Sequence, residues 1–112
     1  MVRKNYIPDR GDIVWLDFDP VKGREQQGRR PAVIISPRRY NAMAEISLAC
    51  PITSVIKKYP FEVNIETPKV KGVILCDQIR AVSWRDRKAK FIASVPKETM
   101  VKIIDKIRLL IS

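Results

Sequence analysis

The hydrophobic pattern of this chain changes period once, and that change constrains the fold more than any other feature. Up to about residue 95, the apolar residues form short segments rich in Val and Ile, separated by polar turns. This pattern is typical of β-strands. From Met100 to Ile111 the apolar residues recur at i, i+3, i+4 and i+7, which is typical of one face of an amphipathic helix. The pattern therefore predicts a mainly β domain, mostly antiparallel, closed by one C-terminal helix that packs on the sheet.

The expected elements follow from the apolar segments between turn residues. We predict strands over residues 13–18, 32–36, 46–49, 60–65, 72–76 (extending toward 82) and 90–95, and a short helical turn over 37–44. Residues 19–30 are polar, contain two glycines and lie between prolines, so we expect a long loop there. Long loops in compact domains are uncommon and often functional.

A chain of 112 residues, 46% of them hydrophobic, suits one domain spanning residues 1–112. No apolar run approaches the roughly 18 residues that a membrane helix needs. The N-terminal residues lack the apolar stretch of a signal peptide. We therefore expect a cytoplasmic protein without a membrane partner.

The chain contains no histidine and only two cysteines, Cys50 and Cys76. The absence of histidine excludes histidine acid–base catalysis, Ser-His-Asp triads and histidine metal sites. Both cysteines lie in apolar segments and form no close-spaced pair, so we expect buried, reduced thiols and no zinc site. We expect no metal and no cofactor.

The charge is strongly positive, with 22 Lys and Arg against 12 Asp and Glu, a formal net charge of +10. Such a field attracts polyanions: nucleic acid, an acidic membrane surface or an acidic protein. The charge alone does not choose among these, and a merely soluble basic protein is also possible.

Three segments could carry chemistry. In the segment 23–31, Glu25 and Gln26 lie near three arginines in the sequence. Guanidinium groups bind phosphate oxygens bidentately, so this segment could bind a phosphate. The alternative is a solvated loop with ordinary ion pairs. Thr53 follows an apolar strand and could bind a phosphate or simply complete a turn. The segment 77–88 surrounds Trp84 with basic residues, and this tryptophan could stack on a base or belong to the core.

These fragments together resemble the MazF/PemK toxin family. The resemblance is carried, in order, by Arg10-Gly11-Asp12-Ile13-Val14, Gly23-x-Glu25-Gln26-x-Gly28-x-Arg30-Pro31-Ala32, Pro51-x-Thr53, Gly72-Val73-x-Leu75-x-Asp77-Gln78-Ile79-Arg80 and Arg85-x-Arg87. It extends from about Tyr6 to the C-terminal helix. It implies an SH3-like β barrel with short helices, a homodimer, and metal-independent, sequence-preferring cleavage of single-stranded RNA. It also implies an acidic antitoxin as partner, with DNA contacted only indirectly through an antitoxin complex.

The resemblance also implies roles for single residues. Arg30 matches the family's catalytic arginine, Thr53 its catalytic threonine, and Glu25 the loop glutamate that could act as base. The remaining matched or neighbouring polar positions are expected to contact RNA: Arg10, Gln26, Arg29, Lys57, Lys58, Gln78 and Arg87. Position 29 is arginine here, where some relatives carry histidine, and this difference could alter sequence preference.

Two other functions remain open from the sequence. One is a non-enzymatic poison of DNA gyrase on the same fold, as in CcdB-like relatives, whose action would need neither Arg30 nor Thr53. The other is an RNA-binding barrel without catalysis. A neighbouring gene for a short acidic protein would favour the ribonuclease toxin or the gyrase poison over the RNA-binding barrel without catalysis.

Overall fold

The computed structural model describes residues 6–17 and 29–112. Within these ranges the chain forms seven strands, two α-helices and one 3-10 helix. The strands are β1 (Asp12–Asp17), β2 (Arg29–Ile34), β3 (Ser47–Thr53), β4 (Glu62–Glu66), β5 (Lys71–Leu75), β6 (Arg80–Val82) and β7 (Lys90–Ser94). The helices are α1 (Arg38–Ala44), the 3-10 helix η1 (Cys76–Gln78) and α2 (Lys97–Ile111).

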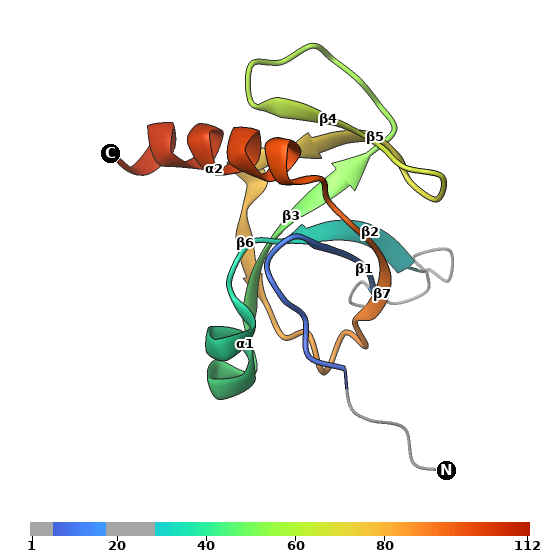
Figure 1. Cartoon of the computed structure of the whole chain (residues 1–112), viewed down its shortest axis with the longest axis vertical. Coiled ribbons are helices and arrows are strands. Elements are labelled where there is room, and N and C mark those ends of the chain that lie inside the picture. The colour runs from blue at the N-terminus through green and yellow to red at the C-terminus, as the bar shows by residue number, and fades with distance from the viewer. Residues whose placement is uncertain (1–5, 18–28) are drawn as a thin grey trace, which may run out of the picture.

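All strand pairs are antiparallel, and they form one curled sheet in the order β4-β5-β3-β2-β1-β7 (Figure 1). Strand β3 also pairs with β6, so three strands depend on it directly. Residues 47–49 of β3 face β6, residues 49–51 face β2, and residues 52–53 face β5. The predicted mainly β architecture with a C-terminal helix is confirmed.

Both faces of the sheet are covered, and β1 shows this most clearly. The alternation predicted for this strand is confirmed: Ile13 packs in one apolar cluster, and Val14 and Leu16 pack in another. The first cluster includes Val33 and Cys50 and extends to α2, while the second lies inside the curl formed by β1, β2, β3 and β6. Two small cores therefore stabilise one sheet.

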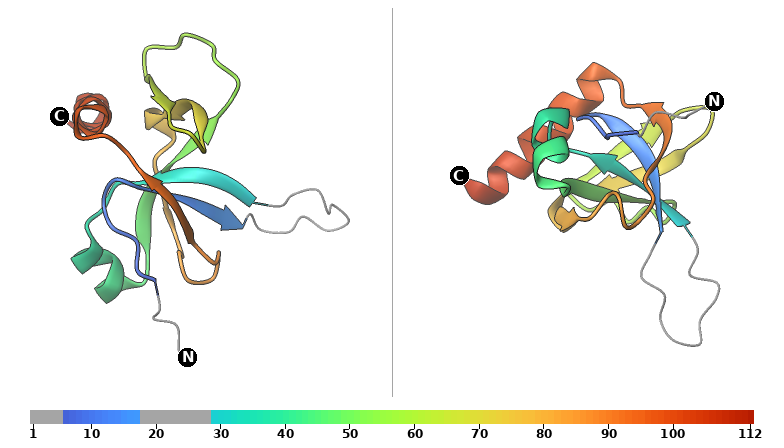
Figure 2. Two further views of the ribbon diagram at one scale, coloured as in Figure 1. Left: turned by 45° about the vertical axis from the view of Figure 1, so that its right-hand side comes forward. Right: turned by 90° about the horizontal axis from the view of Figure 1, so that it is seen from below.

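Helix α2 begins after Pro96, whose fixed φ suits the start of a helix. Its buried residues Ile103 and Ile107 pack against β4 and η1, and Figure 2 shows the helix lying along one side of the sheet. The predicted apolar face is confirmed for this part. Leu110 and Ile111, at its C-terminal end, are exposed, because the sheet ends before the helix does. None of the described helices is both long and apolar enough to cross a membrane.

Three predicted boundaries were wrong. Strand β2 begins at Arg29 rather than at residue 32, because Arg29 and Arg30 pair with the end of β1. Strand β3 continues past Ala49 to Thr53, because β2 and β5 supply partners for its second half. Strand β5 does not continue through residues 76–79, because η1 turns the chain before β6.

The buried polar and sulfur groups settle two open points. Cys50 and Cys76 are free and buried, as predicted, and burial raises the pKa of their thiols to about 12 and about 11. Trp84 is 4% exposed, and its Nε1 donates a hydrogen bond to the carbonyl oxygen of Asn41 at 2.9 Å. Trp84 is therefore a core residue, and a role in stacking on a base is excluded.

Gly72 permits the close approach of β5 to the end of β3. It has φ +154°, and a Cβ at this position would clash with the carbonyl oxygen of Thr53 and lie 3.0 Å from its carbonyl carbon. We expect Gly72→Ala to lower the free energy of unfolding by about 2 kcal/mol or more in urea denaturation, since overpacking shifts the backbone.

Gly11→Ala is the comparison variant, because Gly11 has φ +92° but no neighbouring atom within 4 Å of the added Cβ. We expect Gly11→Ala to lower the free energy of unfolding by about 1 kcal/mol, from backbone strain alone. If both variants lowered the free energy of unfolding equally, the close contact with Thr53 would not be the cause of the destabilisation in Gly72→Ala.

Candidate functional site

A pocket of about 670 Å³ opens between the ends of several strands. Its residues come from β1, β2, β3, β4, β5, η1, β6 and the loops after β3 and β6. They are Leu16, Arg30, Ala32, Ala49, Pro51, Ile52, Thr53, Val55, Lys57, Tyr59, Glu62, Leu75, Asp77, Gln78, Arg80, Val82 and Arg87. The floor is apolar and the rim carries charged and amide groups, an arrangement typical of a binding site.

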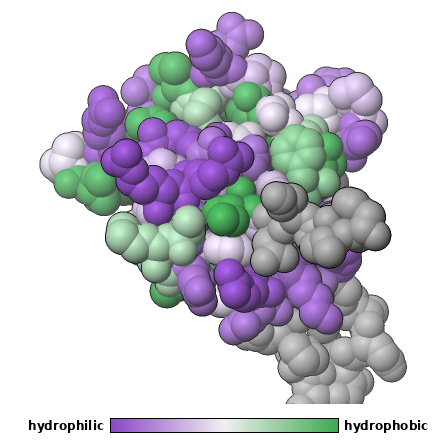
Figure 3. Space-filling model, turned by 60° about the horizontal axis from the view of Figure 1, so that its bottom comes forward, coloured by the Kyte–Doolittle hydropathy of each residue, from purple (hydrophilic) through white to green (hydrophobic). Residues whose placement is uncertain are grey.

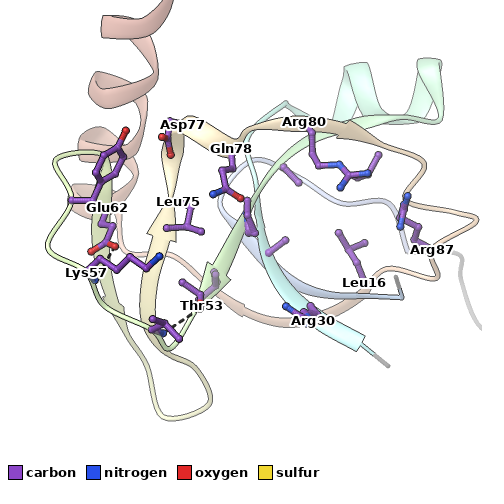
Figure 4. Close-up of a pocket in the computed structure, with 17 residues that line it drawn as sticks. Leu16, Arg30, Thr53, Lys57, Glu62, Leu75, Asp77, Gln78, Arg80 and Arg87 are labelled. Atoms are coloured by element: carbon purple, nitrogen blue, oxygen red, sulfur yellow. Dashed lines mark hydrogen bonds between the residues drawn. The ribbon is translucent and has the colours of Figure 1, made fainter. Parts of the chain in front are cut away.

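Three arginines line one end of this pocket (Figure 4). Arg30 lies on β2 opposite Leu16 of β1, and Arg80 lies on β6 opposite Ala49 of β3. Arg87 donates from Nη1 to the carbonyl oxygen of Asp17 at 3.2 Å. Guanidinium groups brought together in this way form a binding site for phosphate oxygens.

Asp17 connects this end of the pocket to its surroundings. Its carboxylate lies 3.1 Å from Nε of Arg29, and its backbone N–H donates to the carbonyl oxygen of Arg87 at 2.8 Å. Arg29 also donates from Nη2 to the carbonyl oxygen of Lys88 at 3.0 Å. The end of β1 therefore joins β2 to the loop between β6 and β7.

Thr53 is the last residue of β3 and lies in the middle of the pocket (Figure 4). Its side chain is half-buried, and Oγ1 accepts a hydrogen bond from the backbone N–H of Val55 at 3.1 Å. That bond uses a lone pair of the hydroxyl and leaves its proton for another acceptor. Thr53 can thus donate to a phosphate oxygen bound beside Arg30.

The loop between β3 and β4 is tied down by Glu62. Its two carboxylate oxygens accept the backbone N–H groups of Lys57 and Lys58 at 3.1 and 3.0 Å. Lys58 has φ +60°, a conformation that costs energy for a residue with a side chain. Glu62 offsets this cost and places Lys57 at the edge of the pocket.

The opposite end of the pocket carries Asp77 of η1, and the next residue, Gln78, lies between Asp77 and the arginines. The negative charge of Asp77, together with a hydrogen bond to its carboxylate, raises the pKa of Tyr59 above its usual value. Cys76, next to Asp77, is fully buried, and its backbone N–H donates to the carbonyl oxygen of Phe61 at 3.0 Å. The side chains of Asp77 and Gln78 are thus exposed on a fixed backbone.

The structure brings together five of the ten predicted site residues: Arg30, Thr53, Lys57, Gln78 and Arg87. Arg10, Arg29 and Lys58 do not line the pocket. The side chain of Arg10 instead donates from Nε to the carbonyl oxygen of Ile35 at 2.7 Å. The remaining two predicted residues, Glu25 and Gln26, lie outside the described residues.

Four polar residues of the pocket were not among the predicted site residues: Tyr59, Glu62, Asp77 and Arg80. Asp77 and Arg80 flank the predicted Gln78 in one motif, so the sequence contained a signal for them. No local pattern indicates Tyr59 or Glu62, because their position depends on how the loop after β3 folds back.

The surface carries many hydrophilic side chains. Figure 3 shows one face on which hydrophilic side chains form a broad area and hydrophobic ones occur in small groups. Among the described residues, no group of three or more Cys, Asp and Glu residues is arranged to hold a metal ion.

Comparison with known proteins identifies the family. The family of PemK-like, MazF-like toxins of type II toxin–antitoxin systems matches residues 9–111. The chain belongs to this toxin family. It is 45% identical over 106 residues to the endoribonuclease toxin MazF of Escherichia coli strain K12, covering 95% of this chain and 96% of the relative. It is 30% identical over 112 residues to the endoribonuclease PemK of Escherichia coli, covering 96% and 84%.

A solved structure of the toxin family shares the fold. In the crystal structure of MazE-MazF (Form-III) from Deinococcus radiodurans, the similar chain is 42% identical, with a TM-score of 0.87. The alignment covers 94% of this chain and 96% of that one. The family resemblance noted from the sequence is thereby confirmed, as is the fold it implied.

The role of Glu62 in this toxin-family pocket can be tested by amide hydrogen exchange. In Glu62→Ala we expect the amides of Lys57 and Lys58 to exchange at least about tenfold faster by NMR, because charged acceptors contribute about 1.5–3 kcal/mol per hydrogen bond. Glu66→Ala is the matched control on the same strand, since the Glu66 carboxylate pairs only loosely with Lys71, at 3.9 Å. Unchanged exchange in Glu62→Ala would contradict the assignment.

Proposed function

We propose that this chain is the endoribonuclease toxin of a type II toxin–antitoxin system and that it cleaves single-stranded RNA in the pocket around Arg30 and Thr53. The observation that carries the proposal is the meeting of five predicted site residues in one pocket. The toxin relatives that share most of this chain's length are named endoribonucleases, which supports the same activity here. The gyrase-poison hypothesis does not require this set of residues, and the relatives' endoribonuclease activity favours catalysis over simple RNA binding.

Arg30 is proposed to stabilise the charge that develops on the scissile phosphate. Guanidinium groups are poor proton donors in proteins, so electrostatic stabilisation is a better role for an arginine than general acid catalysis. The neighbouring Arg80 and Arg87 add positive charge at the same end of the pocket.

Thr53 is proposed to orient the reacting phosphate by donating its hydroxyl proton to a nonbridging oxygen. Glu25 is the candidate general base for the ribose 2′-hydroxyl. In this scheme the 2′-oxygen attacks phosphorus as its proton passes to the base, and the bond from phosphorus to the 5′-oxygen breaks. The leaving oxygen takes a proton from water, so the products are a 2′,3′-cyclic phosphate, or the 3′-phosphate after its hydrolysis, and a 5′-hydroxyl. We propose that no metal or cofactor takes part.

The proposed partners follow from the charge. With a net charge of +10, the pocket region attracts both RNA and an acidic protein segment. The MazE-MazF crystal structures of Deinococcus radiodurans contain a family member with its antitoxin, which supports an acidic antitoxin here. We further propose a cytoplasmic homodimer, in which each chain is a single domain spanning residues 1–112.

The proposal predicts metal-independent cleavage that depends on the pocket. Purified wild type should produce discrete cuts in a long single-stranded RNA in EDTA. Arg30→Ala should lower kcat/KM by about 100-fold or more, since a group that stabilises transition-state charge contributes at least that much. Thr53→Val should also lower it strongly, while Thr53→Ser, which keeps the hydroxyl, should retain most activity.

Arg39→Ala is the charge-matched control, because Arg39 is an exposed arginine of α1 outside the pocket. It should cut as the wild type does. Cleavage that survives in Arg30→Ala and in Thr53→Val would remove both residues from the mechanism. No cleavage by the wild type on RNA of varied sequence would overturn the proposed function.

The nucleophile can be tested on the substrate. A 2′-O-methyl group on the nucleotide 5′ to the cut should abolish cleavage, because it removes the attacking hydroxyl. The same modification one nucleotide further away should have a small effect, and a DNA oligonucleotide should be inert. Cutting at the methylated position, or of DNA, would contradict attack by the 2′-hydroxyl.

A further inference from the structure

The pocket carries opposite charges at its two ends (Figure 4). Arg30, Arg80 and Arg87 line one end, and the other carries the two carboxylates Glu62 and Asp77 with a single cation, Lys57, beside Glu62. Gln78 and Thr53 lie between them. A phosphate is attracted to the first end, whereas at the second end two carboxylates outweigh the one ammonium group of Lys57, and Asp77 lies on the side away from it. An RNA strand bound across the pocket therefore presents a base, not a phosphate, to the carboxylate end.

The two carboxylates differ in what they already bind. Both oxygens of Glu62 accept backbone N–H groups, from Lys57 and Lys58, so this carboxylate serves the loop. Asp77 is exposed at the rim and interacts with Tyr59. The contact with Tyr59 leaves Asp77 further lone pairs for a ligand, and its side chain is exposed, whereas Glu62 is partly buried. Asp77 is thus the more accessible of the two carboxylates to a base.

The surroundings of Asp77 suit a base. Tyr59 lines the pocket beside it, with 49% of its surface exposed, and its ring packs against Phe61 at a centroid distance of 5.9 Å. An exposed aromatic ring on a supported loop is a surface on which a base can stack. Leu75 adds apolar contact at this end of the pocket.

We propose that Asp77 is a specificity-determining residue that selects, next to the scissile phosphate, a base carrying an exocyclic amino group. This inference rests on the proposed ribonuclease function. The carboxylate accepts from the N4 amino group of cytosine, the N6 amino group of adenine or the N1 and N2 donors of guanine. Uracil is disfavoured, because two carbonyl oxygens flank its single N–H and would face the carboxylate.

The test uses the full-length wild type, Asp77→Asn and Asp105→Asn on a randomised single-stranded RNA library, with the new 5′ ends sequenced. Asp105 is an exposed carboxylate of α2 outside the pocket, so its variant controls for net charge. In the wild type one position beside the cut should be depleted of uracil. In Asp77→Asn uracil at that position should rise about tenfold relative to the other bases, since an amide can donate to a uracil carbonyl.

A second measurement needs no variant. In an oligonucleotide that the wild type cuts, the bases beside the cut are replaced one at a time by counterparts without the amino group: purine for adenine, hypoxanthine for guanine, 2-pyrimidinone for cytosine. One replacement should lower kcat/KM about tenfold. This arm decides the question if Asp77→Asn does not fold or does not cut.

The outcomes separate the two proposals. If the wild type cuts RNA but Asp77→Asn has the same base profile at every position, or no amino-group deletion lowers the rate, the role of Asp77 is overturned and the ribonuclease function stands. If the wild type cuts no RNA, both proposals fall.

Discussion

Strand β3 is the element on which the rest of the structure depends, because its backbone pairs with three other strands. Its first residues bind β6, its middle binds β2, and its end binds β5. Pro51 cannot donate a backbone hydrogen bond, yet it lies opposite Ala32, within the segment where β3 leaves β2 and joins β5. The pocket opens at this transition. Thr53 at the end of β3, and Gly72 beside it, lie where the two parts of the sheet meet.

The second physical theme is the separation of charge across the pocket. Three arginines from β2, β6 and the following loop gather at one end, and like charges brought together destabilise a folded protein. A bound polyanion removes this repulsion, so it stabilises the folded state as it binds. RNA and an acidic protein segment both satisfy the requirement.

Much of the fold could be predicted from local patterns. The alternation around Ile13 and the helical spacing around Ile103 and Ile107 identify their elements, because burial imposes those periods. The extent of β3 could not be predicted, since a proline within a segment argues against a central strand. The break after Leu75 was also missed: apolar residues resume at Ile79 after Asp77 and Gln78, and only the packing of η1 against α2 shows that the chain turns there.

For the site, the sequence by itself determined the kind of chemistry. The chain has no histidine and a strong positive charge, and the motifs that contain Arg30 and Thr53 are those of a known toxin family. These properties depend only on the type and order of the residues, so the sequence alone shows them. Only the tertiary structure decided which side chains share a pocket. It moved Trp84 into the core, and it brought Tyr59 and Glu62 to the site. The physical reason is that these positions depend on contacts between separate parts of the chain. Strands that are distant in the sequence pair with each other, and backbone hydrogen bonds hold the loop that folds back to the site.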